Sequence, residues 1–225
     1  MRTHFRTRTR FLALLAGLFA IAAAGAVQHV SAQQGSGAGR RSVSPVYSTW
    51  DTATVLGRSA VVRTDKGISA TFETSNLPPG QAITLWFGVI NNPAACATSP
   101  CTPADADNPD TRTDFLWGGG NIVGASGKGA LAGRLAVGDV SGSAFIEFGM
   151  PQAAVGLTDP WNAEIILLLH SHGPALTGQA LKHQMTSFLG GCDVFLGGAD
   201  GFADGPGDIP ANVGECATFQ QSTHQ

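Results

Sequence analysis

Short runs of β-forming residues, separated by turns rich in Gly, Pro and Asn, recur along most of the chain and constrain its fold more than any other feature. The runs 58–63 and 68–73 flank the sequence Thr-Asp-Lys-Gly, which predicts a hairpin with Gly67 at positive φ. The runs 83–90 and 164–169 predict two strong strands, and the aliphatic composition of the second is typical of a strand buried on both faces. About seven or eight such strands predict a mainly β domain, an antiparallel β-sandwich or barrel of the jelly-roll or Greek-key type.

Composition supports this class, because only 13% of the residues are charged and 30 are glycine, whereas helical proteins are rich in Glu, Lys and Leu. We expect one short helix, over 177–189, after the strand that carries a His-x-His motif. We also expect a second hairpin from 115–123 and 129–137, and another strand over 143–148. The segment 91–114 is rich in Cys, Asp and Pro, which predicts an insertion with little regular structure.

The first 32 residues predict a secretory signal peptide. A basic stretch with four arginines and no acid precedes an uninterrupted apolar run over 11–27, and small residues follow at Val30 and Ala32. We expect cleavage after Ala32. The alternative is an uncleaved membrane anchor, because the apolar run is at the lower limit of what spans a bilayer as a helix.

The remaining chain predicts a flexible lead-in over 33–45 and a single domain over 46–225, with a Gly/Asp-rich loop over 192–216. This part has nine Lys and Arg against sixteen Asp and Glu, a formal net charge of −7. Binding of nucleic acid requires clustered cations, so we expect no nucleic-acid partner. After leader cleavage we also expect no membrane association, a secreted or periplasmic location, and an envelope or extracellular ligand.

All four cysteines follow the leader, and an even number in an exported chain predicts disulfides. Three pairings are available. We favour Cys96–Cys101 and Cys192–Cys216, because each pair closes a loop rich in Gly, Pro or Asp. A zinc site with four cysteine ligands is the rival interpretation, but such sites use closely spaced Cys pairs that this chain lacks.

His170 and His172 end the aliphatic run 164–169. Residues two apart on a strand point to the same face, so both imidazoles project together. Neutral imidazole is a good ligand for copper and zinc, and His183 on the expected helix is a candidate third ligand. The alternative is structural: both histidines hydrogen-bond the loop backbone and fix the following turn.

Two Asp-rich loops predict a calcium site, because Ca²⁺ takes six to eight oxygen ligands from flexible loops. The alternative is that Asp and Gly are ordinary turn residues in solvated loops. The candidate ligands are Asp105, Asp107 and Asp110 in the insertion, and Asp200, Asp204 and Asp208 in the C-terminal loop.

Enzymatic chemistry has little support in the sequence, which contains no Gly-x-Ser-x-Gly motif and no acid pair with defined spacing. Four tryptophans offer a different function: exposed on one face, they would form a platform for sugar binding, whereas buried they would fill a core. They are Trp50, Trp86, Trp117 and Trp161.

Four short motifs together resemble those of a group of exported bacterial proteins of unassigned function, and the resemblance covers most of 55–220. They are Leu-Pro-Pro-Gly at 77–80, Asn-Asn-Pro at 91–93, His-Gly-Pro at 172–174 and Gly-Gly-Cys at 190–192. The strand ending in His-x-His-Gly is also similar to a short part of the extracellular CHRD domain, a β-sandwich module. The resemblance implies an extracellular β domain and implies no activity.

These observations predict an exported, non-catalytic binding or structural domain with an unknown ligand. A Cu/Zn-binding protein or metalloenzyme centred on His170 and His172 is the alternative, and a carbohydrate-binding module is the third hypothesis.

Overall fold

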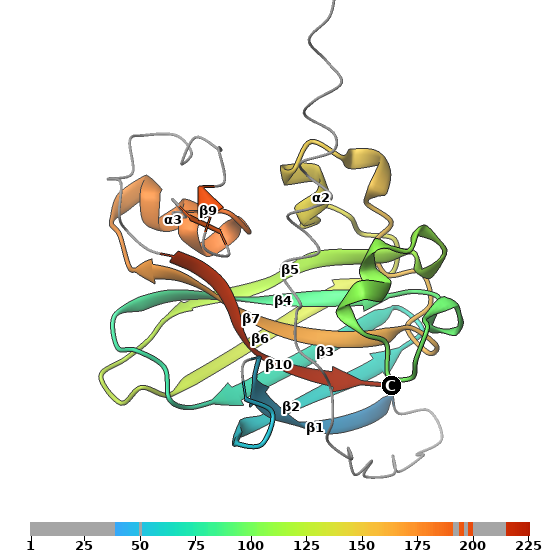
Figure 1. The fold of residues 1–225 in the computed structure, drawn as a ribbon, viewed down its shortest axis with the longest axis horizontal. Helices are drawn as coiled ribbons and strands as arrows, with labels where there is room; N and C mark the ends of the chain where they lie inside the picture. The colour runs from blue at the N-terminus through green and yellow to red at the C-terminus, as the bar shows by residue number, and fades with distance from the viewer. Residues whose placement is uncertain (1–38, 50, 191–193, 196–197, 200–214) are drawn as a thin grey trace, which may run out of the picture.

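The computed structural model describes residues 39–49, 51–190, 194–195, 198–199 and 215–225. Eight strands form one antiparallel sheet in the order β5-β4-β7-β10-β1-β2-β3-β6, which curls into a nearly closed barrel (Figure 1). This confirms the expected mainly β class. The strands are β1 Arg40–Ser48, β2 Val55–Thr64, β3 Gly67–Thr74, β4 Gln81–Ile90, β5 Thr113–Ile122, β6 Gly129–Ala136, β7 Glu164–Pro174 and β10 Glu215–His224.

The barrel interior holds the larger apolar core, to which β3 contributes by strict alternation. Ile68, Ala70 and Phe72 point inward and are buried, whereas the residues between them are exposed. Inward residues of β4 and β7 complete this core with positions that are also fully buried. The turn between β2 and β3 is the predicted hairpin, and Gly67 has a φ of 145°.

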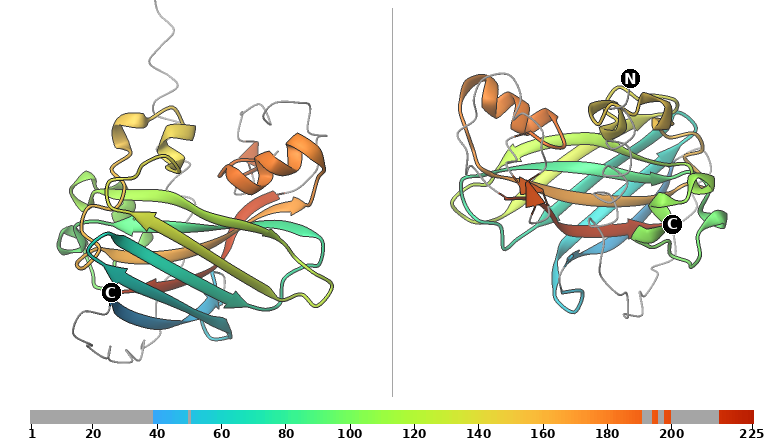
Figure 2. Two further views of the ribbon diagram at one scale, coloured as in Figure 1. Left: turned by 180° about the vertical axis from the view of Figure 1, so that it is seen from behind. Right: turned by 45° about the horizontal axis from the view of Figure 1, so that its top comes forward.

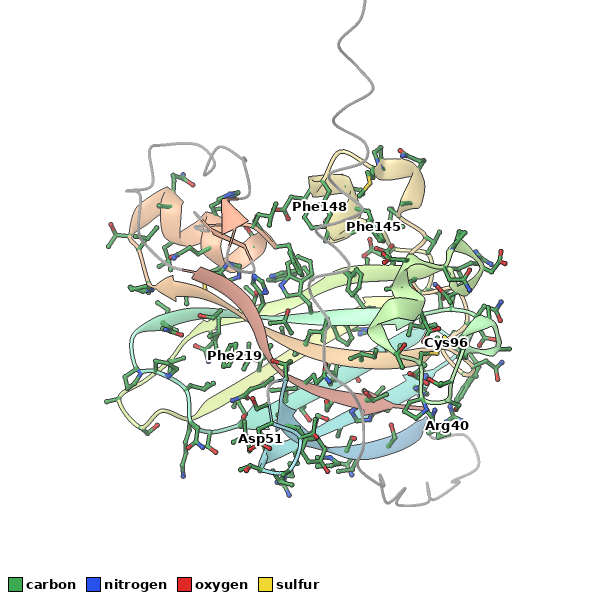
Figure 3. The ribbon with its side chains drawn as sticks, in the orientation of Figure 1. Arg40, Asp51, Cys96, Phe145, Phe148 and Phe219 are labelled. Carbon is green, nitrogen blue, oxygen red and sulfur yellow. A yellow bond between two sulfur atoms is a disulfide. The ribbon has the colours of Figure 1, made fainter. Side chains whose placement is uncertain are left out.

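A second apolar core covers the outer face of β4, β5 and β7, so that β4 and β7 are buried on both faces, as predicted for 164–169. Its outer layer includes residues of the short helix α2, Ala144–Glu147, and Phe188 and Leu189, which follow the second helix, α3 Gly178–Thr186. Both helices lie above the β5 side of the barrel (Figure 2). Phe145 and Phe148 of the α2 region project toward the sheet (Figure 3). The helix expected after the His-x-His strand is therefore confirmed as α3.

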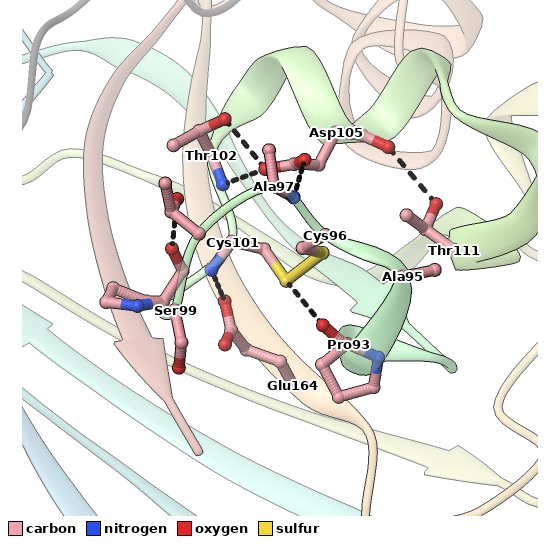
Figure 4. Close-up of a disulfide and its surroundings, with 12 residues drawn as sticks. Pro93, Ala95, Cys96, Ala97, Ser99, Cys101, Thr102, Asp105, Thr111 and Glu164 are labelled. Carbon is pink, nitrogen blue, oxygen red and sulfur yellow. Dashed lines mark hydrogen bonds between the residues drawn. A yellow bond between two sulfur atoms is a disulfide. The ribbon is translucent and has the colours of Figure 1, made fainter.

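The insertion after β4 consists of three short 3₁₀ turns, η2 Pro93–Ala95, η3 Pro103–Asp107 and η4 Pro109–Thr111, and a fourth, η5 Pro151–Ala153, follows α2. The disulfide Cys96–Cys101 is formed, with the two Cα atoms 5.5 Å apart (Figure 4). The other predicted pair, Cys192–Cys216, lies outside the residues whose side chains the structure describes.

The flexible lead-in expected over 33–45 is wrong from Arg40 onward, because β1 begins there and pairs with β2 from Arg40 opposite Arg63. Pairing with a neighbouring strand outweighs the weak local preference of a Gly- and Ser-rich segment. The leader, 1–32, lies outside the described residues.

The prediction that 115–123 and 129–137 form a second hairpin is also wrong, although both strands exist. The strand β5 pairs with β4, and β6 pairs with β3, so the two lie at opposite ends of the ladder order. Where they approach each other, glycine permits backbone contact: a Cβ on Gly133 would lie 2.9 Å from the Cα of Gly118. This glycine seam, Gly118 and Gly119 of β5 against Ala132 and Gly133 of β6, brings the two sheet edges together.

Two further expectations fail in the second half of the chain. The strand expected over 143–148 is helix α2, whose first turn is capped by Ser143 accepting a hydrogen bond from the amide of Phe145. The C-terminal strand β10, unforeseen, lies between β7 and β1 and begins within the loop expected over 192–216. That loop also contains two short strands, β8 Val194–Phe195 and β9 Gly198–Ala199.

Candidate functional site

His170 and His172 lie side by side on the outer face of β7, as the strand spacing predicts. Both side chains are completely buried, and their ring centroids are 4.8 Å apart. Phe188, which follows α3, covers His170 at 4.6 Å and packs edge-on against Trp86 of β4 at 4.9 Å. The pair is therefore enclosed between the barrel wall and the segment after α3.

A directed chain of hydrogen bonds fixes the tautomer of His172. Its Nδ1 lies 2.7 Å from the carbonyl oxygen of Gly190, which only accepts, so Nδ1 carries the proton. The Nε2 lone pair then accepts from the hydroxyl of Thr84, at 2.7 Å. That hydroxyl oxygen accepts in turn from the indole nitrogen of Trp86, at 2.8 Å. The two ring nitrogens of His172 thus connect β4 to the segment 187–190, here called the cover segment.

Burial keeps both imidazoles neutral at physiological pH. Burial, with a smaller contribution from the nearby His183, lowers the pKa of His172 to about 4, although the Gly190 hydrogen bond opposes this shift. The pKa of His170 lies well below its ordinary value because of burial and then of repulsion from His172, while a hydrogen bond with the Phe188 backbone opposes the shift. His170 also faces the hydroxyl of Thr218 on β10, at 3.4 Å.

Neutral imidazoles suit a metal, but the surroundings of this pair favour the structural interpretation. Coordination through Nε2 of His172 would require the Thr84 hydroxyl to give up its acceptor. His183 lies on α3, and in the described part of the chain no three His, Cys, Asp or Glu side chains are grouped as metal ligands. Copper or zinc binding at His170, His172 and His183 remains a prediction.

The cover segment 187–190 is held from the α2 side as well. The carboxylate of Glu147 accepts hydrogen bonds from the hydroxyl of Ser187, from the amide of Phe188 at 2.7 Å and from the amide of Leu189 at 3.0 Å. One acidic side chain therefore joins α2 to the segment that encloses the histidines.

Gln184 anchors α3 itself to the end of β7. Its buried amide donates to the carbonyl oxygens of His172 and Pro174 at 2.9 and 3.0 Å, and accepts from Leu176 at 2.8 Å. Gln184 therefore fixes the backbone at His172 to α3, while Thr84 fixes the ring of His172 to β4.

Asp105, a predicted calcium ligand, caps a turn in the described structure. Its carboxylate accepts from the amide of Ala97 at 2.7 Å, and from the amide and hydroxyl of Thr102 at 2.6 and 2.7 Å (Figure 4). Burial alone would raise the pKa of Asp105, but these hydrogen bonds outweigh it and lower the pKa. The side chain thereby braces the disulfide loop.

The other predicted calcium ligands do not converge with Asp105 in the described residues. Asp107 and Asp110 are both exposed, and no metal-type grouping includes them there. The remaining candidates, Asp200, Asp204 and Asp208, lie outside the described residues. Calcium binding therefore stays a prediction.

Asp114 is a buried acid whose role the sequence did not reveal. It accepts four hydrogen bonds, from the amides of Phe115, Val155 and Gly156 and from the hydroxyl of Ser143, at 2.6 to 2.8 Å. Burial raises the pKa of Asp114, and the hydrogen bonds oppose that shift. This carboxylate fastens the α2 region onto β5.

The tryptophans do not share one exposed face. Trp86 is 1% exposed and belongs to the second core. Trp117, half-buried, donates to the carbonyl oxygen of Met185, and Trp161 donates to Asp65 in the β2–β3 turn, both at 2.9 Å. Trp50 lies outside the described residues. A sugar platform that includes Trp86 is therefore wrong, and carbohydrate binding elsewhere remains a prediction.

A second buried polar cluster, missed from the sequence, occupies the barrel end where β10 finishes. The Nε2 of His224 lies 2.8 Å from the hydroxyl of Ser59, and its Nδ1 lies 2.9 Å from that of Ser42. Ser59 also donates to Ser222, at 2.7 Å. Burial, followed by the nearby charge of Arg63, lowers the pKa of His224 to about 4. Because Ser59 and His224 are each 2% exposed, this Ser–His contact is enclosed and serves packing.

Comparison of the chain with models of protein families, with curated proteins and with solved structures finds no match. The resemblance to exported bacterial proteins and to the CHRD domain therefore remains a prediction. Among the residues that the structure describes, no helix is long and apolar enough to cross a membrane.

Proposed function

We propose that this protein is an exported, non-catalytic domain with a binding or structural role in the cell envelope or the surrounding medium. The observation that carries the proposal is the engagement of His172, whose two ring nitrogens bond Thr84 and Gly190 within the fold. A group held on both sides in this way positions backbone and is unsuited to proton transfer with a substrate.

Two buried acids also support a structural role. Asp105 and Asp114 each accept several hydrogen bonds from backbone amides and hydroxyls, which is the pattern of carboxylates that fasten loops. Export is supported by the leader-like first 32 residues and by the Cys96–Cys101 disulfide, because disulfides persist in oxidising compartments.

Transition-metal binding is the second candidate function, favoured by one specific observation. Two neutral imidazoles, 4.8 Å apart on one face of β7, are suitable ligands for copper or zinc after a rearrangement of Thr84. The two candidates differ in what holds the histidines, hydrogen bonds alone or a metal ion.

Elemental analysis of the folded, oxidised protein, dialysed without chelator, separates them. The structural role predicts no stoichiometric copper or zinc, and predicts that His172→Ala lowers the free energy of unfolding. A stoichiometric metal that is lost in His170→Ala and His172→Ala, with the fold intact, would replace the first proposal by the second. Lys182→Ala is the matched control, because Lys182 is exposed on α3 and is not a candidate ligand.

A further inference from the structure

Two arginines lie directly opposite each other on adjacent strands at one end of the barrel. Arg40 begins β1 and is paired in register with Arg63 near the end of β2. Both occupy inward positions, in line with the core residues Val46 on β1 and Val61 on β2. Like charges in directly opposed positions of a sheet are destabilising unless another group neutralises them.

In the described part of the chain, the protein groups that contact these guanidinium groups are neutral. Arg63 is 0% exposed and donates to the carbonyl oxygens of Pro160, Ala163 and His224, at 2.8, 2.8 and 3.1 Å. Arg40 donates to the carbonyl oxygen of Trp161, at 2.6 Å. In the described residues the one ion pair is elsewhere, between Arg58 and Glu73.

The nearest acids are engaged with other donors. Glu164 accepts from the amide of Cys101 and the side chain of Gln225, each at 3.0 Å. Asp159 accepts from Trp161 and Asn162, which belong to its own turn. Neither acid lies within ion-pair distance of Arg40 or Arg63, although both attract Arg63 from farther away.

Each of the two guanidinium groups retains a buried donor. The Nε atoms of Arg40 and Arg63 are both buried and have no hydrogen-bond acceptor among the described residues. Leaving a charged donor buried without an acceptor is costly, which makes two such atoms on neighbouring side chains unusual.

We propose that this end of the barrel binds a small oxyanion, a carboxylate, phosphate or sulfate group, between Arg40 and Arg63. Such a group would accept from both Nε atoms and neutralise the facing charges, because guanidinium donors match oxyanions in geometry and charge. Arg40 is half-buried, so the anion enters from its side, at the barrel end where β10 finishes (Figure 3). The site is separate from His170 and His172 and does not depend on the role proposed above.

Titration of the full, oxidised protein with phosphate, sulfate and acetate tests the site, with chloride at equal ionic strength as reference. We expect at least one oxyanion to raise the thermal midpoint and to give saturable binding in calorimetry. Arg40→Gln should weaken that binding at least tenfold. Arg58→Gln, an exposed arginine on the same strand β2 as Arg63, is the matched control and should bind as the unmodified protein does.

Nuclear magnetic resonance provides a second readout if Arg40→Gln fails to fold. The Nε–H resonances of Arg40 and Arg63 in the unmodified protein should shift on titration, and that of Arg58 should not. Saturable binding of free phosphate or sulfate at this site would indicate that the ligand is a free ion. Tighter binding of an acidic oligosaccharide than of acetate would indicate an acidic group on a larger molecule. A response to all three oxyanions no greater than to chloride, or an unchanged response in Arg40→Gln, would overturn the proposal.

Discussion

The Nδ1 atom of His172 and the carbonyl oxygen of Gly190 are 2.7 Å apart, which ties the strand β7 to the segment that covers it. The same ring is tied to β4 by the hydroxyl of Thr84. One neutral imidazole therefore joins three parts of the chain, and the second apolar core around Trp86 and Phe188 is built against it.

Replacement of His172 by Phe keeps the volume similar and removes both hydrogen bonds. The hydroxyl of Thr84 and the carbonyl of Gly190 would then lose a buried partner, so we expect the free energy of unfolding to fall by about 2 to 4 kcal/mol. Urea denaturation measures this. His183→Phe, on the half-buried side of α3, should change it by less than about 1 kcal/mol. Equal effects of the two substitutions would contradict the role of His172.

Acid should destabilise the domain below neutral pH. The folded pKa values of His172 and His224 are about 4, whereas unfolded histidine titrates near pH 6.5. Protons thus bind the unfolded chain first, so stability is complete above about pH 6.5 and is lost as the pH falls toward 4, by up to about 3 kcal/mol for each histidine.

Burial is the main cause of both low pKa values, and electrostatic repulsion from His183 for His172, and from Arg63 for His224, contributes to them. Asp114 and Glu164, whose pKa values are raised, act in the opposite direction by taking up protons in the folded state. Urea midpoints at a series of pH values should fall steeply between pH 6.5 and 4.5, and less steeply in His172→Phe. A flat profile over this range would show that the buried histidines do not resist protonation.

Replacement of Glu147 by Gln should loosen the cover segment without unfolding the barrel. The carboxylate accepts three hydrogen bonds from 187–189, and an amide presents only one acceptor. We expect the amides of Phe188 and Leu189 to exchange with solvent about tenfold faster. Glu73→Gln, which disrupts an exposed ion pair on β3, is the control and should leave both exchange rates unchanged.

The seam between β5 and β6 should tolerate no side chain. A Cβ on Gly133 would lie 2.7 Å from a ring carbon of Phe87 and 2.9 Å from the backbone of Gly118, so we expect Gly133→Ala to destabilise by about 1 to 3 kcal/mol. At Gly124 nothing lies within 4 Å of such a Cβ, so Gly124→Ala should be nearly neutral in the same denaturation experiment. Similar midpoints for both variants would mean that the seam is looser than described.

Local signals in the sequence predicted the parts of the fold that depend on local chemistry. The turn at 64–67 and the aliphatic run 164–169 were recognisable because a glycine turn and a doubly buried strand each leave a contiguous pattern. The same holds for His170 and His172, since strand geometry alone places them on one face.

The strand β10 escaped prediction because its inward positions are polar. Gln220, Ser222 and His224 are each 2% exposed, so the usual rule that buried positions are apolar fails there. Their burial depends on partners distant in sequence, such as Ser59 and Thr74, which donate hydrogen bonds to Ser222 and Gln220 across the barrel. No alternation of apolar residues marks such a strand.

Contacts between strands that are distant in the sequence could not be predicted from local patterns either. The opposition of Arg40 and Arg63 follows from the β1–β2 register, and the glycine seam follows from how the sheet curls. In 143–148, a short apolar run fits a strand or a helix, and the cap by Ser143 decides for the helix.

The most direct test of the structural role of the histidines is a nitrogen-15 spectrum of the imidazole rings in the folded, oxidised protein at pH 7. The account predicts that His172 is neutral, with the proton on Nδ1 and an unprotonated Nε2, and that a chelator leaves its resonances unchanged. A proton on Nε2, or resonances that shift when a chelator removes copper or zinc, would contradict it.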